Sequence, residues 1–405
     1  MIEVRQHRQA YTPLRIAPRS FAFTVLLGLF AALPALSIDM SAPTLALLPD
    51  ALGTSRTLAG LTLSLFMVGF ALGQLGGGGL SDHHGRRPLL LSGLTCFTLA
   101  GIACALSLSG GVLALSRLVQ GFGAGACSVI SFAMVQDLFE GDAARAKRSY
   151  VTVIFGAVPI LAPALGSMLT DLFGWRSVHG VLAVAGGLLL IVTWVGVAES
   201  RLAGLAVLAQ TGQSGSTRLR DDSGFVRITL ANALSYGGIF AYIAGSPVVI
   251  IGQMGLSSAI FAGVFACTAA ALAAGAWTSG LFSRRGVGAA ALLNPSLVVA
   301  MGATLVLAAV SLSGITSGSI LVPLLLAVLF TRGVIAPNLQ HLAIDRQRER
   351  AGAASAVVGV SQLLSGALAS AAVAVLLPSL GPSAVAVPMA LLAAAALVAW
   401  RWTDR

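Results

Sequence analysis

Charged residues are scarce in this chain: of its 405 residues, 9% are charged and 57% are hydrophobic. Soluble domains carry roughly 25% charged residues. The 14 acidic and 24 basic side chains are too few to cover an apolar core of this size with a polar shell. The composition therefore excludes a water-soluble fold and indicates that the solvent is lipid.

Cysteine is also rare, and the usual signatures of catalysis are missing from the sequence. The 4 cysteines lie in apolar stretches without CxxC or histidine spacing, which predicts neither a disulfide framework nor a zinc site. The adjacent His83 and His84 have no second ligand cluster, so we predict no bound metal. No GxSxG, HExxH or Walker motif occurs. We expect no enzyme, no cofactor and no ATP-driven pump, so any transport must be driven by an ion gradient or by the substrate.

The net charge of +10 does not indicate a nucleic-acid partner. A nucleic-acid surface gathers bases on one face, with aromatic platforms between them. Here the bases stand in short loops between apolar runs, which is typical of a membrane protein.

Long apolar runs predict an all-α membrane protein of twelve transmembrane helices, because a bilayer core of about 30 Å needs about 20 apolar helical residues. Residues 21–37 imitate a signal peptide, but the many later apolar segments favour an uncleaved first span. We divide the chain into a cytoplasmic tail (1–20), a six-helix bundle (21–198), a polar cytoplasmic linker (199–222) and a second six-helix bundle (223–402). The predicted spans are 21–48, 55–77, 88–108, 110–137, 147–170, 174–198, 223–250, 257–283, 288–312, 317–341, 350–377 and 382–402.

The positions of the basic residues predict the orientation. Apart from Arg117 and Arg332, which lie within spans, all of them except Arg56 and Arg176 fall in the loops and span ends of one side. Cytoplasmic loops retain Arg and Lys, so both termini are expected in the cytoplasm.

Two ionisable residues within spans are the candidates for ion coupling. A charge inside a span costs about 2.5–3.5 kcal/mol on insertion scales and points to function. At 1.5 Å per residue, Asp39 in span one and Arg117 in span four reach similar depths and could interact. A buried carboxylate favours its neutral form and a nearby guanidinium opposes this, which suits a proton-coupling site. The alternative is a permanent ion pair that pins two helices together.

Other residues allow weaker predictions. Arg332 in span ten lies nearer the cytoplasmic end and could snorkel, and His179 in span six could titrate near neutral pH or be structural. Glycines spaced four apart, including Gly69 with Gly73 and Gly121 with Gly125, allow close helix packing.

The loop from Gly78 to Pro88 is too polar for a simple turn. Asp82 can pair with an arginine, while Arg86 and Arg87 can reach Asp137 at the cytoplasmic end of span four. Such a cluster could latch that face of the protein. Prolines in span five and near the end of span seven, and Pro337 in span ten, can act as bending points or as static kinks.

These residues together resemble the major facilitator superfamily and, within it, drug:proton antiporters of the bicyclomycin- and chloramphenicol-resistance type. The segment Gly78 to Pro88 resembles the signature between helices two and three, and Leu115 to Gly125 resembles the helix-four motif. Ile38-Asp39-Met40 resembles the acidic motif of helix one. The antiporter motif of helix five is resembled by Gly156, Pro159, Pro163 and Gly166, although Ala162 replaces its usual glycine.

The resemblance implies two bundles around a central cavity, with alternating access. It implies that Asp39 binds the transported proton, that Arg117 tunes it, and that Asp82, Arg86, Arg87 and Asp137 gate the cytoplasmic side. Ser41 and Ala42 replace larger residues of the family pattern, so the pocket is expected to differ from the family norm. We assign the wall of the substrate cavity to Met40, Gln120, Ser246 and Gln362.

The leading hypothesis is therefore proton-coupled efflux of small amphipathic compounds by a monomer in the bacterial inner membrane. An apolar cavity with few charges could contact many hydrophobic drugs. The alternatives are a carrier for a specific metabolite and a membrane receptor that does not transport.

Overall fold

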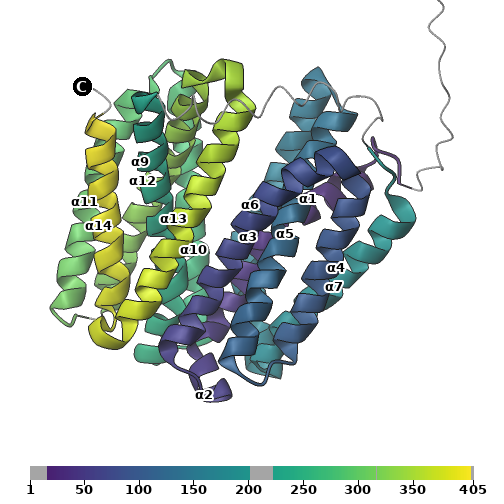
Figure 1. Ribbon diagram of the computed structural model, residues 1–405. Helices are drawn as coiled ribbons and strands as arrows, with labels where there is room; N and C mark the ends of the chain where they lie inside the picture. Colours follow the sequence, from purple (N-terminus) through teal and green to yellow (C-terminus); the bar gives the residue numbers. More distant parts are fainter. Residues whose placement is uncertain (1–15, 201–221, 316, 403–405) are drawn as a thin grey trace, which may run out of the picture.

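The computed structural model describes residues 16–200, 222–315 and 317–402, and it contains 12 helices long and apolar enough to cross a membrane. No strand occurs among these residues. Most of the predicted tail and linker, including Gln213 and Arg218, lies outside the described residues. The predicted all-α membrane fold of two six-helix bundles is confirmed (Figure 1).

Each bundle contains six long helices. The N-terminal bundle consists of α1 (Phe21–Ser41), α3 (Arg56–His84), α4 (Arg86–Ala105), α5 (Gly110–Leu138), α6 (Gly141–Phe173) and α7 (Trp175–Gly196). The C-terminal bundle consists of α9 (Ser223–Pro247), α10 (Ser258–Arg284), α11 (Ala289–Leu312), α12 (Gly318–Arg346), α13 (Ala351–Leu380) and α14 (Ser383–Arg401). Shorter elements are the 3-10 turns η1 (Ala42–Ala46) and η5 (Arg348–Arg350), the helix α2 (Leu48–Leu52) and the π-helical turn η4 (Val248–Gln253).

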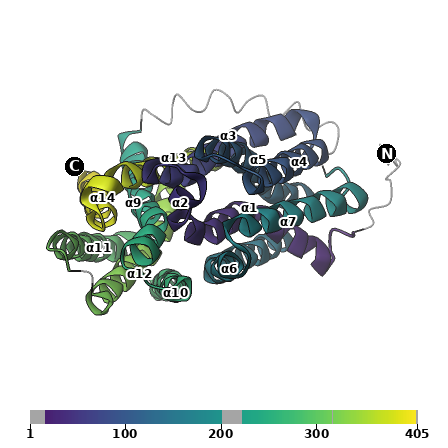
Figure 2. The ribbon, with the colours of Figure 1, turned by 90° about the horizontal axis from the view of Figure 1, so that it is seen from below.

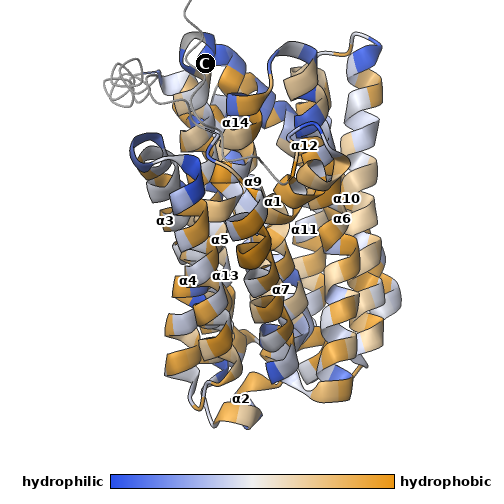
Figure 3. Ribbon diagram, turned by 90° about the vertical axis from the view of Figure 1, so that its right-hand side faces the viewer, coloured by the Kyte–Doolittle hydropathy of each residue, from blue (hydrophilic) through white to orange (hydrophobic). Residues whose placement is uncertain are grey.

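Serine side chains mark the starts of several spans. Ser55 accepts a hydrogen bond from the backbone N–H of Leu58 at 3.1 Å, and Ser20 accepts one from Phe23 at the same distance. These bonds satisfy backbone donors that lack an intrahelical partner in the first turn. Apolar residues cover the middle of the helices, while hydrophilic residues gather toward the two ends (Figure 3).

Glycines let the second and fourth helices of each bundle touch backbone to backbone. A Cβ on Gly121 in α5 would lie 2.0 Å from the Phe66 carbonyl oxygen in α3, and one on Gly69 in α3 would lie 1.9 Å from the Leu118 carbonyl oxygen. The C-terminal bundle repeats this contact, because a Cβ on Gly333 in α12 would lie 2.0 Å from the Leu272 carbonyl oxygen in α10. The predicted close packing by glycine is confirmed.

The two bundles meet at one end of the molecule and diverge at the other. Across the interface α3 packs against α13 and α6 against α10 (Figures 1 and 2). At the end that carries α2, Ser258 hydrogen-bonds to Asp171, and a Cβ on Gly60 in α3 would lie 2.6 Å from the Cβ of Ala374 in α13. In Figure 1 the ribbons move apart toward the opposite end, where the C-terminus lies.

The predicted loop after span two is wrong in its extent. Helix α3 continues to His84, and α4 begins at Arg86. Only Gly85 interrupts the helical path, with a φ of +93° that favours glycine. Bilayer thickness determines only the length of the apolar part of a transmembrane helix. A prediction based on that length therefore misses the polar helical turns that extend beyond the lipid.

Candidate transport site

The carboxyl group of Asp39 lies on the wall of a cavity between the two bundles. The side chain is 4% exposed, and the cavity has a volume of about 220 Å³. Among the described residues, Asp39 has no hydrogen-bond or ion-pair partner. An unpaired carboxyl group at this depth is costly when ionised, and a bound proton or a cationic ligand would remove that cost.

The rest of the cavity wall is mainly aromatic and aliphatic. Helices α1, α3 and α6 contribute from one bundle, and α9, α10 and α12 from the other. Besides Asp39, the polar groups in the wall are the hydroxyls of Tyr236, Tyr242 and Thr268. The main apolar lining residues are Phe70, Phe155, Pro159, Ile239, Phe240, Ile243, Phe265, Leu272 and Leu329. The predicted apolar character of the cavity is therefore confirmed.

Arg117 reaches α1 but does not pair with Asp39. Its Nη2 donates to the Ser37 carbonyl oxygen at 3.2 Å and to Ser41 Oγ at 3.1 Å, and its Nη1 donates to Gln120 Oε1 at 2.7 Å. Ser37 and Ser41 are each two residues from Asp39, about 200° around the helix, so Arg117 binds the face of α1 away from the carboxyl group. The expected contact between the two charges is absent from this conformation of the described residues, and so is the permanent ion pair of the alternative interpretation.

A small polar cavity of about 10 Å³ lies beside Arg117. It is lined by Ser41, Thr44, Thr62, Arg117 and His179, together with four leucines. The His179 ring is 2% exposed and makes an edge-on contact with Trp175, and its Nδ1 has no hydrogen-bond partner among the described residues. His179 therefore belongs to the surroundings of Arg117 and does not line the central cavity.

The proline- and glycine-rich segment of α6 lies next to Asp39. Pro159 lines the central cavity. A Cβ on Gly166 would lie 2.2 Å from the carbonyl oxygen of Met40, so the α6 and α1 backbones touch beside the acid. Pro163 is buried between these two positions, while Gly156 faces open space. The segment thus combines tight contact with α1 and two helix-bending prolines.

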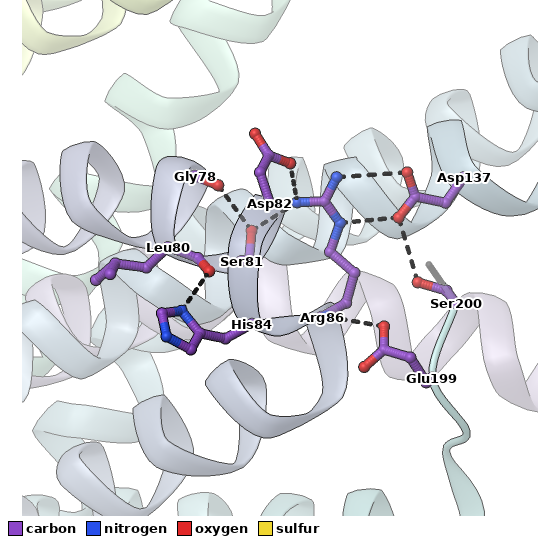
Figure 4. A network of polar contacts seen from close by, with 9 residues as sticks. All are labelled: Gly78, Leu80, Ser81, Asp82, His84, Arg86, Asp137, Glu199 and Ser200. Atoms are coloured by element: carbon purple, nitrogen blue, oxygen red, sulfur yellow. Dashed lines mark hydrogen bonds and ion pairs between the residues drawn. The ribbon is translucent and has the colours of Figure 1, made fainter. Parts of the chain in front are cut away.

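Three of the predicted gate residues, Asp82, Arg86 and Asp137, form a polar cluster (Figure 4). It lies where α3 ends and α4 begins, at the end of the N-terminal bundle opposite α2. The guanidinium of Arg86 lies between two carboxylates, with Nε 2.8 Å from Asp137 Oδ2 and Nη1 2.8 Å from Asp82 Oδ1. Ser81 Oγ accepts a further bond from Nη1 at 2.6 Å. Arg87 points elsewhere and donates to the Trp194 carbonyl oxygen at 2.8 Å.

Glu199 is a member of this cluster that the sequence did not reveal. Its carboxylate accepts a hydrogen bond from the backbone N–H group of Arg86 at 2.8 Å (Figure 4). It accepts another from the backbone N–H group of Arg87 at 3.0 Å. A carboxylate at a helix N-terminus satisfies free donors and interacts favourably with the helix dipole. Glu199 therefore joins the end of the N-terminal bundle to the start of α4.

The four residues assigned to the substrate cavity lie elsewhere. Met40 packs against α6 because it is rotated about 100° from Asp39 on the helix. Gln120 is fully buried and accepts the bond from Arg117, and Gln362 donates to Asn232 at 3.3 Å. Ser246 lines a separate cavity inside the C-terminal bundle. The aromatic residues of α9 and α10 line the central cavity instead.

Two basic residues of the C-terminal bundle differ in their surroundings. Arg332 is 4% exposed inside the bundle, where the missing side chain of Gly238 leaves room for its guanidinium. Of the possibilities that the sequence left open for Arg332, snorkelling to the helix end is therefore not the one adopted. Arg346 forms an ion pair with Asp222 at 2.8 Å. Partial burial acts to raise the pKa of Asp222, but the hydrogen bonds from Arg346 and from the Phe225 N–H outweigh it and lower the pKa below its ordinary value.

Comparison with known proteins agrees with this geometry. Residues 25–370 match the sequence profile of the Major Facilitator Superfamily. The chain is 31% identical over 353 residues to the uncharacterized MFS-type transporter YdgK of Bacillus subtilis (strain 168), covering 86% of this chain and 87% of that protein. It is 27% identical over 366 residues to a bicyclomycin resistance protein homolog of Haemophilus influenzae (strain ATCC 51907 / DSM 11121 / KW20 / Rd), covering 88% and 89%.

A similar arrangement of helices occurs in the crystal structure of a D-xylose-proton symporter. The TM-score is 0.75 at 16% sequence identity, and the likeness covers 94% of this chain and 97% of the symporter. The sequence match covers most of the chain, and it agrees with the twelve membrane-spanning helices and the two-bundle arrangement of the structure. The chain therefore belongs to the Major Facilitator Superfamily of transporters.

Proposed function

We propose that this transporter exports small amphipathic compounds from the bacterial cytoplasm in exchange for protons. One observation carries the proposal: Asp39 presents a buried carboxyl group, without a partner among the described residues, to a cavity between the bundles. A group in this position can hold a proton or face a substrate. Binding of one therefore weakens binding of the other, which is the requirement for exchange.

The same proposal includes the orientation of the protein in the inner membrane. Arg86, Arg145 and Arg346 lie toward the end where the bundles diverge, and the positive-inside rule assigns that end to the cytoplasm. Both termini are then cytoplasmic. The present conformation corresponds to an inward-facing state, closed at the end where Ser258 contacts Asp171.

The wall of the cavity supports an amphipathic substrate over a polar metabolite. Sites for polar metabolites carry several placed hydrogen-bonding groups, whereas this wall has one carboxyl group and three hydroxyls among apolar side chains. Aromatic surfaces accept many hydrophobic compounds with little selection. The name of the bicyclomycin-resistance relative is consistent with an antibiotic as substrate.

We further propose that the two bundles rock about the cavity, as in other transporters with two repeats. Pro159 and Pro163 would let α6 bend as the cytoplasmic side closes. The cluster of Arg86, Asp82 and Asp137 would stabilise one arrangement of helix ends on that side. Arg117 would hold the back face of α1 while Asp39 changes partner, and a single chain would suffice for the cycle.

The test is proton movement in proteoliposomes that contain the purified protein and an internal pH dye. A panel of hydrophobic drugs and small metabolites is added under an imposed pH gradient. We expect drug-dependent proton flux in the wild type. Asp39→Asn should abolish gradient-driven accumulation, because it keeps the shape of the side chain but removes the titratable group. The control is Asp50→Asn, which changes an exposed carboxylate in α2 and should behave as wild type.

Each outcome separates the hypotheses. Gradient-driven accumulation of drug by Asp39→Asn at the wild-type level would exclude Asp39 as the coupling acid. Flux with one metabolite, and no competition by unrelated drugs, would favour the metabolite carrier. An absence of flux with every compound would favour the non-transporting receptor.

A further inference from the structure

A second cavity, of about 140 Å³, lies inside the C-terminal bundle at the end where α2 lies. Five helices of that bundle and the π-helical turn η4 form its wall. π-Helical turns are rare in proteins, and those that occur are often found at functional sites. Here the turn directly follows Pro247, the last residue of α9. Representative lining residues are Ser246, Ile250, Met254, Gly318, Leu325 and Val385.

The side chain of Tyr242 is shared by the walls of this second cavity and the central one. Tyr242 is 2% exposed and lines both cavities. Its hydroxyl is 3.0 Å from that of Thr268, and its ring stacks on Phe265 with centroids 5.8 Å apart. Thr268 and Phe265 belong to the wall of the central cavity. Because the ring belongs to both walls, its rotation, with loss of the bond to Thr268, would bring the two spaces into contact.

The chemistry of the second cavity limits what it can hold. Among the described residues, no charged side chain lines it, and its polar groups are the hydroxyls of Tyr242, Ser246 and Ser311. It therefore suits an uncharged, mainly hydrocarbon group. Small-molecule sites usually have volumes of about 300–1,000 Å³. The central cavity, at about 220 Å³, falls below this range, whereas the two cavities together reach it.

We propose that the second cavity is an apolar subsite for the tail of elongated amphipathic substrates, and that Tyr242 is the door between it and the central cavity. The head of the substrate would remain beside Asp39, and the tail would pass Tyr242 into the C-terminal bundle. The proposal rests on the proposed function, because it concerns the substrates of that same site. It makes Tyr242 a residue that determines the accepted length of substrate.

Binding of alkyltriphenylphosphonium ions to the protein in lipid nanodiscs tests the subsite. Their chains increase from methyl to octyl, and the measured quantity is the ratio of the methyl Kd to the octyl Kd. Gly318→Phe places a ring at the second cavity, where a Cβ meets no atom within 4 Å. Gly263→Phe is the matched control, since Gly263 is equally open but lines neither cavity. Lipid partitioning of each ion is the same for all variants and cancels.

We expect Gly318→Phe to lower the ratio at least about tenfold, the effect of excluding roughly two methylene groups at about fourfold each. Gly263→Phe should leave the ratio unchanged. Equal ratios in both variants and the wild type would overturn the proposal. If Gly318→Phe does not fold, Tyr242→Phe replaces it: loss of the bond to Thr268 frees the ring, and the ratio should rise. An unchanged ratio in Tyr242→Phe would equally overturn the proposal.

The binding measurement does not require transport, so the two proposals fail separately. If Gly318→Phe lowers the ratio of the methyl Kd to the octyl Kd but no compound causes proton flux, the subsite is retained and proton-coupled export is rejected. If drugs cause proton flux but Gly318→Phe leaves the ratio unchanged, proton-coupled export is retained and the subsite is rejected.

Discussion

Two serines one helical turn apart on α1 form a matched pair for testing how Arg117 is held. Ser41 Oγ accepts a hydrogen bond from Arg117 at 3.1 Å and donates one to the Ser37 carbonyl oxygen at 2.6 Å. Ser37 Oγ is buried and has no hydrogen-bond partner among the described residues. Replacement by alanine therefore breaks a bond to a cation at position 41 and removes an unsatisfied hydroxyl at position 37.

The two substitutions should change the free energy of unfolding by different amounts. A hydrogen bond to a charged group contributes about 1.5–3 kcal/mol in soluble proteins, whereas bonds between membrane helices average about 0.6 kcal/mol and reach about 1.7. We therefore expect Ser41→Ala to lower the free energy of unfolding by about 1–2 kcal/mol. Ser37→Ala should be neutral or slightly stabilising, because an unpaired buried hydroxyl costs free energy.

The assay is reversible unfolding in mixed micelles, titrated with a denaturing detergent. A double-mutant cycle with Arg117→Met isolates the contact, because Ser41→Ala should cost little once the guanidinium is absent. Equal effects of Ser37→Ala and Ser41→Ala would refute the assignment. So would a Ser41→Ala effect that persists in the Arg117→Met background.

Two further predictions concern ion pairs at the helix ends. Arg86→Gln should lower the free energy of unfolding by about 2–4 kcal/mol, somewhat less than the loss of a fully buried ion pair. The control is Arg145→Gln, which removes an exposed pair and should lower it by under about 1 kcal/mol in the same assay. Because the folded protein lowers the pKa of Asp222, its ionised form contributes stability that is complete above the unfolded pKa of about 3.9 and is lost as the pH falls through the lower folded pKa. The stability difference between wild type and Asp222→Asn should therefore shrink below about pH 4, and a difference independent of pH would contradict it.

The sequence predicts the fold well because lipid imposes strong local rules. Each apolar run of sufficient length must be a helix, since only helices and closed barrels satisfy their backbone groups in a bilayer. The close contact between α3 and α5 could also be predicted from the sequence, because small residues four apart lie on one face of a helix. Polar helix ends follow no such rule, so α3 extends to His84 where a loop was predicted.

The site was harder to predict because side-chain direction depends on helix rotation. Depth along the membrane places Asp39 and Arg117 at one level, but it does not say which face of α1 each one meets. Met40 shows the same limit, since one step along the helix turns it from the cavity toward α6. Glu199 carries no motif, and only the fold brings it to the start of α4, more than 100 residues away in sequence.

The positions of Asp39 and Arg117 on opposite faces of α1 bear on how exchange can occur. If the two were paired, each proton or cation arriving at Asp39 would have to break a buried ion pair, which is strongly unfavourable in low dielectric. Here the Arg117 guanidinium is satisfied by Ser37, Ser41 and Gln120 and stacks on the Phe66 ring, 4.2 Å from its centroid. Asp39 can therefore change partner without disturbing the packing behind it. In the exchange proposed above, the Arg117 guanidinium would fix α1, and the Asp39 carboxyl group on the opposite face would be free to take up a proton or a cationic substrate.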